Sequence, residues 1–301
     1  MSLKDYKDLV LNAAWMWSED RAPSMGAAIA YYTIFSLAPV LILVIAIVGL
    51  VFGELAAEGA IVGQLTELFG PDGARAVQAM IASAGNEGSG TIATVVALVL
   101  LAIAATTVFS ELQASLNVIW KAAPSKRSAP VALVKTRLIS LSLVVAIGFL
   151  LMVSLVISAG LTAFAGYLDS LFPELDVIVR LVSVGISFTV TAVLFGMIYK
   201  ILPDTRIEWQ DVIVASLTAA FLFTVGKVAI GLYIGSTAVA STYGAAGALV
   251  TVLVWVYYSA QILLFGAEMA KSYARTFGSR RQRRSGRRGR EPDPLEEVSE
   301  G

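Results

Sequence analysis

The chain has 301 residues, of which 57% are hydrophobic and only 15% are charged, and its formal net charge is zero. Soluble domains carry about 25% charged residues, so this composition excludes an ordinary soluble protein and predicts a membrane protein. The absence of histidine and cysteine excludes disulfides, the commonest metal ligands and any nucleophile activated by a histidine. We therefore expect no cofactor, no metal and no enzymatic activity.

The N-terminal residues predict an amphipathic helix. Apolar side chains recur at helical spacing over residues 3–17, which indicates one apolar face. Such a helix either lies in the membrane interface or packs on the protein's own cytoplasmic loops. Residues 1–24 are accordingly interpreted as a cytoplasmic helix with a linker.

Six segments are long and apolar enough to cross the hydrocarbon, which needs about 20 residues. The predicted fold is therefore an all-α, polytopic membrane bundle covering residues 25–275, with short amphipathic helices at the interfaces. A run rich in glycine and serine, 235–247, predicts a tight reversal before the last span. The predicted spans are 26–52, 91–120, 138–168, 181–200, 211–234 and 244–271.

Lysines and arginines alternate between sparse and dense loops along the chain. The loop 121–137 holds five, whereas the first and third loops hold one each and the fifth holds none. Because basic loops stay in the cytoplasm, this pattern places both termini there. Trp120, Tyr199, Trp209 and Tyr273 are then expected at the cytoplasmic interface, where aromatic rings with a polar tip are favoured.

The longest loop, 54–90, would face outward. Apolar residues at helical spacing predict two short helices there, on either side of 70–73. The pair either caps the bundle from outside or rests on the bilayer.

The C-terminal segment 276–301 is predicted to be a disordered cytoplasmic tail. It holds seven arginines between Arg280 and Arg290, followed by five acids. The arginines are expected to anchor the tail and to contact anionic lipid headgroups, so membrane lipids are the expected partners. No aromatic residues alternate with these arginines, so we do not expect nucleic acid as a partner.

Pro39 lies inside the first predicted span and should kink it. A proline leaves the carbonyl of Phe35 without its helical donor, and Ser36 or Thr33 could satisfy it. The kink either opens a substrate path, lined by Tyr31, Tyr32 and Ser36, or is only structural. The small residues nearby would allow close helix packing and even a homo-oligomer.

Ionisable residues are rare within the spans and should face the bundle interior or water. Glu111 either joins a hydrogen-bond network with Gln113 and Asn117 or lines a path. Lys227 either reaches to the outer interface or binds an anionic headgroup. Glu268 either captures a basic residue at the cytoplasmic rim or takes part in function. Tyr243, in the predicted reversal, completes the candidate set.

Several segments together resemble the YihY/BrkB family of bacterial inner-membrane proteins, once mislabelled as ribonucleases. They are 26–39, which reads GAAIAYYTIFSLAP, Leu202-Pro203 before Trp209, 241–247 (STYGAAG), Trp255-Val-Tyr-Tyr-Ser and Gly266-Ala-Glu268. The resemblance covers roughly residues 10–275. It implies a six-helix bundle in a bacterial or archaeal cytoplasmic (inner) membrane, with a role in virulence or envelope integrity.

Three functions follow from these observations, in order of preference. The first is a transporter or lipid-translocating protein of the envelope, working around the Pro39 kink. The second is a structural or scaffolding envelope protein with a solid core. The third, a membrane-bound hydrolase or ribonuclease, has the least support, because the sequence supplies no catalytic cluster.

Overall fold

A computed structural model describes residues 3–84, 91–122, 137–143, 146, 148, 150, 176–236 and 239–278 of the chain. Within these ranges every regular element is a helix and no strand is present. The all-α membrane fold predicted from composition is therefore confirmed. The helices are α1 (Leu3–Glu19), α2 (Ala22–Phe52), α3 (Glu54–Ala84), α4 (Thr91–Trp120), α6 (Asp176–Ile201), α7 (Trp209–Ser236) and α8 (Val239–Thr276).

Four described segments are long and apolar enough to cross a membrane. They are Ala22–Ala46, Val184–Ile201, Trp209–Ala229 and Leu249–Thr276. The predicted span 138–168 falls mostly outside the described residues, so six spans remain a prediction. The start of the last helix was misplaced, because α8 begins at Val239 rather than near Gly244. Most of the run 235–247 is therefore helical, and the turn-forming character of its glycines and serines does not prevent it.

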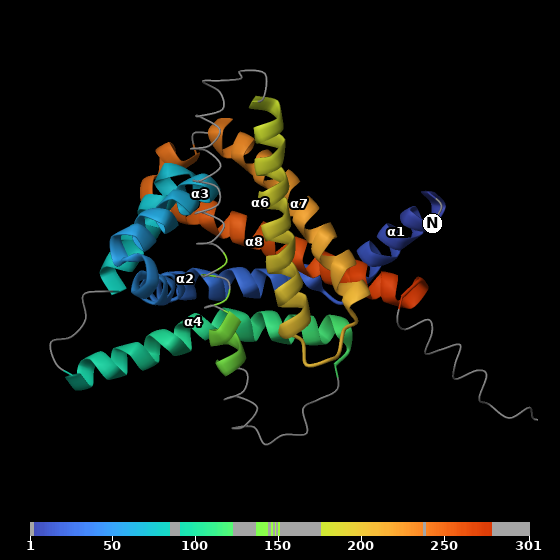
Figure 1. Ribbon diagram of the computed structural model, residues 1–301, viewed down its shortest axis with the longest axis horizontal. Helices are drawn as coiled ribbons and strands as arrows, with labels where there is room; N and C mark the ends of the chain where they lie inside the picture. The colour runs from blue at the N-terminus through green and yellow to red at the C-terminus, as the bar shows by residue number, and fades with distance from the viewer. Residues whose placement is uncertain are drawn as a thin grey trace, which may run out of the picture.

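The central helix of the bundle is α8, which packs against α1, α2, α3, α4 and α7. Figure 1 shows α2 and α4 lying side by side, with α1 and the C-terminal end of α8 together at one end of the long axis. We call this the α1 end. Buried residues from α2, α3, α4, α6, α7 and α8 form one continuous core along the bundle, which includes Leu116, Tyr199 and Leu264.

Two predicted amphipathic helices appear as α3, which is broken at Gly70 by a left-handed backbone (φ 73°). Its buried Leu65, Ala74 and Val77 join Val252 and Trp255 of α8 in a second core cluster. Of the two alternatives for the loop 54–90, the structure favours packing on the bundle. Figure 1 places α3 at the far end of the long axis from α1.

The helix α1 packs on the protein itself. Its Leu9 and Ala13 are buried against Met269 of α8, and the Ser272 hydroxyl donates to the carbonyl of Leu9. Tyr6 and Trp15 on its other faces are exposed. One edge of α1 is thus fixed to α8, while apolar rings remain free to reach a membrane surface.

Candidate functional site

Three charged side chains meet at the α1 end. The Nζ atom of Lys271 lies 2.5 Å from Oδ2 of Asp20 and 3.1 Å from Oε2 of Glu268. Glu268 is fully buried, the Lys271 side chain is 2% exposed and that of Asp20 is 13% exposed. Glu268 therefore captures a basic residue, which is one of the two alternatives that the sequence left open. We call these three residues the charged triad.

The charged triad contains two carboxylates and one ammonium. Burial raises the pKa of Asp20, but hydrogen bonds with Lys271 and Glu268 and the positive charge of Lys271 outweigh it and hold the pKa below the ordinary 3.8. One lysine thus links the connection between α1 and α2 to the last turns of α8. Sequence reasoning missed Asp20 and Lys271, although Lys271 follows Glu268 at the i, i+3 spacing that joins side chains on one helix face.

A second polar cluster joins α4 to the connection between α6 and α7. The Gln113 amide donates to the carbonyl of Leu202 at 2.8 Å, and the Asn117 amide donates to Asp204 at 3.1 Å. The backbone amide of Asp204 donates back to Asn117 at 2.8 Å. A hydrogen-bond network of Gln113 and Asn117 therefore links these two parts of the chain.

Glu111 is not a member of that network, which corrects the sequence interpretation. Gln113 and Asn117 are four residues apart and share one helix face, whereas Glu111 lies two residues earlier and points away from it. Within the described part of the chain, Glu111 forms no ion pair and is half-buried.

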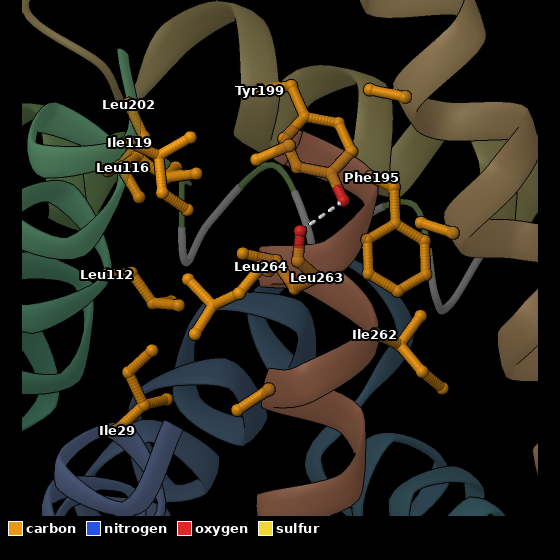
Figure 2. Packing of buried hydrophobic residues seen from close by; sticks show 14 of the residues in the cluster. Ile29, Leu112, Leu116, Ile119, Phe195, Tyr199, Leu202, Ile262, Leu263 and Leu264 are labelled. Atoms are coloured by element: carbon orange, nitrogen blue, oxygen red, sulfur yellow. Dashed lines mark hydrogen bonds between the residues drawn. The ribbon is translucent and has the colours of Figure 1, made fainter. Parts of the chain in front are cut away.

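Tyr199 is a core residue rather than an interfacial one. Its ring is buried, and its hydroxyl donates to the carbonyl of Leu263 on α8 at 2.8 Å, as Figure 2 shows. Trp120 is buried in the same core, whereas Trp209 is exposed as expected. Both rings therefore pack against neighbouring helices near the end of their own helix, and their level relative to the membrane interface stays a prediction.

The residues around Pro39 form an exposed aromatic cluster on α2. Tyr31 is 59% exposed and Tyr32 is 38% exposed, and the Tyr31 ring contacts both Tyr32 and Phe35. Neither tyrosine hydroxyl has a hydrogen bond within the described residues. We call Tyr31, Tyr32 and Phe35 the α2 aromatic cluster.

The hydroxyls near Pro39 bond to other carbonyls than expected. Ser36, which is buried, donates to the carbonyl of Tyr32, and Thr33 donates to that of Ile29 at 2.7 Å. Both reach back one turn, so neither serves the carbonyl of Phe35 that Pro39 leaves free. Helix α2 continues through Pro39 from Ala22 to Phe52, and the predicted kink is still a prediction.

The remaining predicted residues lie apart from these clusters. Lys227 is half-buried on α7, roughly 24 Å along the helix from Asp211. Tyr243 lies in α8, but its side chain is outside the described residues, as is the arginine cluster 280–290. The candidate residues that are described therefore fall into separate groups on α2, α4, α7 and α8 rather than into one site.

Arg137 is a further polar residue, which the sequence analysis counted with the loop 121–137. It is the first described residue of the helical segment 137–143, and its Nη1 atom donates to the carbonyl of Ile103, at 2.8 Å, in the middle of α4. Clusters of three or more acids that could hold a metal are absent from the part of the chain that the structure describes.

These features define a polytopic helical membrane protein with buried polar links between its helices. Its sequence matches the family model described as virulence factor BrkB over residues 15–290. The chain belongs to this family, which confirms the resemblance to YihY/BrkB proteins.

Curated relatives carry the name UPF0761 membrane protein. The chain is 29% identical over 254 residues to one from Ralstonia nicotianae, covering 84% of this chain and 55% of the relative. It is 28% identical over 262 residues to one from Pseudoalteromonas translucida, covering 83% of this chain and 81% of the relative. The chain thus spans about half the length of the Ralstonia relative. No solved structure matches it.

Proposed function

We propose that this protein moves amphipathic molecules, lipids above all, across the cytoplasmic membrane and so serves the cell envelope. Both termini lie in the cytoplasm in this proposal, in agreement with the alternation of basic loops. The observation that carries it is the α2 aromatic cluster.

The α2 aromatic cluster presents the hydroxyl groups of Tyr31 and Tyr32 at a level where the membrane around α2 would be hydrocarbon. Tyr31 lies nine residues after Ala22, where the apolar span of α2 begins, which is roughly 14 Å along the helix axis. Since the hydrocarbon core is about 30 Å thick, this distance would place Tyr31 inside it. An unpaired hydroxyl in hydrocarbon is unfavourable, because no water is present to satisfy it. A polar headgroup passing along α2 would supply the missing partner, while the aromatic rings and Phe35 contact the acyl chains.

The test is lipid movement in proteoliposomes made with the purified full chain. A phospholipid with a fluorescent label on its headgroup is placed in both leaflets, and a membrane-impermeant reductant bleaches whatever reaches the outer leaflet. We expect the protein to raise the bleached fraction above the half seen in protein-free vesicles. The double variant Tyr31→Phe/Tyr32→Phe keeps the rings but removes both hydroxyls, so it should slow the movement severalfold.

Phe221→Leu on α7 is the matched control, because this ring is 60% exposed and has no hydroxyl. It should leave the rate unchanged. If folded protein moves no lipid of any headgroup, the proposal is wrong. The continuous core of the bundle, which includes Leu116 and Leu264, would then support the structural or scaffolding role instead.

A further inference from the structure

Arg137 places a positive charge against an apolar helix. Its Nη1 atom lies 2.8 Å from the carbonyl oxygen of Ile103, 2.6 Å from Oγ1 of Thr106 and 3.4 Å from Oγ1 of Thr107. These acceptors lie in the uncharged stretch 91–110 of α4. Ile103 is 17 residues before Trp120, or roughly 25 Å along the helix. The guanidinium therefore contacts α4 well away from its end.

The charge on Arg137 has no counter-charge in the described part of the chain. The three acceptors are one carbonyl and two hydroxyl groups, and no described carboxylate forms an ion pair with Arg137. Glu111 lies one turn beyond Thr107 on α4 but does not reach Arg137. A charged arginine inside the membrane is unfavourable, so such residues normally pair or mark a binding site.

The donors that remain on Arg137 form a planar fork. Every hydrogen bond from Arg137 to the described residues uses Nη1, so Nε and Nη2, on one edge of the guanidinium, have no acceptor in the part of the chain that the structure describes. That edge matches two oxygens of a phosphate or carboxylate. Ser140, one turn further along the same segment, is fully buried and its hydroxyl has no hydrogen-bond partner, so a second polar group there lacks a partner.

We propose that Arg137 binds the phosphate of a membrane phospholipid through Nε and Nη2, beside the α4 face formed by Thr106 and Thr107. The bilayer supplies this anion at high local concentration, and the flanking apolar surface of α4 suits the acyl chains. The inference rests on the proposed function in taking a lipid as the ligand, but binding is measured without any lipid movement.

The test is thermal stabilisation of the purified full chain in detergent by titrated lipids. Dioleoyl phosphatidylglycerol should raise the unfolding temperature in a saturable way. Dioleoylglycerol, which has the same chains and no phosphate, should not. Arg137→Gln should weaken the phosphatidylglycerol affinity by about tenfold or more, the effect of losing a charged bidentate contact.

Two further variants keep the test informative if Arg137→Gln folds poorly. Arg137→Lys keeps the charge but loses the fork, so it should fold and bind phosphatidylglycerol more weakly than the wild type. Arg206→Gln removes an exposed arginine of the connection between α6 and α7 and should bind as the wild type does.

Three results would overturn the inference. The first is equal stabilisation by the two lipids, and the second is full discrimination between them retained in both Arg137 variants. The third is stabilisation by inorganic phosphate as strong as that by phosphatidylglycerol, which would indicate a soluble anion. Loss of binding with lipid movement intact would refute only this inference, whereas binding without movement would support it and refute the proposed transport.

Discussion

Lys271 and Asp20 are 251 residues apart in the chain, yet the Lys271 ammonium and an Asp20 carboxylate oxygen form a direct ion pair. The pair fixes the connection between α1 and α2 to the end of α8. Because Glu268 joins the same ammonium, a single cation neutralises much of the buried negative charge at the α1 end.

Removing that cation should destabilise the protein strongly. Lys271→Met leaves the carboxyl groups of Asp20 and Glu268 beside each other without their cation, and removing one partner of a buried ion pair costs about 3–5 kcal/mol. Thermal unfolding in detergent at neutral pH measures the effect. Lys4→Met, at an exposed position of α1, is the control, and equal stability of the two variants would contradict the role of the charged triad. Adding Glu268→Gln to Lys271→Met should recover part of the loss.

Acid should weaken the same link. The pKa of Asp20 is held below its ordinary 3.8 in the folded protein. Asp20 therefore contributes fully to stability above its unfolded-state pKa of about 3.9, and this contribution is lost as the pH falls through its lower folded-state pKa. The stability difference between wild type and Asp20→Asn should therefore be constant from neutral pH down to about pH 5 and shrink below about pH 4. Unfolding temperatures across a pH series measure it, and a difference that grows in acid would contradict the assignment.

The close approach of α7 and α8 depends on Gly266. A Cβ added there would meet the Tyr199 hydroxyl and lie 3.2 Å from both the Ala215 carbonyl oxygen and the Ala219 Cβ. Gly266→Ala should therefore destabilise the protein by about 1–3 kcal/mol through overpacking. Gly59→Ala on α3 has open space around the new methyl group and should be neutral or stabilising, because alanine favours helix. Unfolding in a denaturant series distinguishes the two.

The hydrogen bond from Tyr199 to Leu263 should contribute measurably by itself. Tyr199→Phe keeps the ring and removes only the hydroxyl, so the expected loss is about 1 kcal/mol. Tyr6→Phe on the exposed side of α1 provides the comparison. A loss no larger than that of Tyr6→Phe would mean that the buried bond adds no net stability.

The orientation in the membrane can be tested directly, because the chain has no cysteine. Gln210→Cys, at the start of α7, is predicted to face the cytoplasm, and Gly59→Cys, on α3, is predicted to face outward. A membrane-impermeant maleimide added to intact cells should label only the second, and both should react after lysis. Labelling of Gln210→Cys in intact cells would reverse the topology.

The sequence by itself determined the membrane class, the helical fold and the approximate position of most described helices. It also indicated the break at Gly70. These features depend on composition and on the spacing of apolar residues along a single segment, which are local properties. The run 235–247 shows the limit of such patterns, since most of it lies in the end of α7 and the start of α8 despite its small and turn-forming residues.

Only the tertiary structure decided which polar groups meet. Asp20 with Lys271, Gln113 with Leu202 and Arg137 with Ile103 each join segments whose contact depends on how the helices are rotated and shifted against one another. Tyr199 shows the same dependence, because an aromatic ring at a helix end suits either the interface or the core. The choice comes from the cost of leaving a polar group unpaired inside the bundle, which only the assembled helices can satisfy.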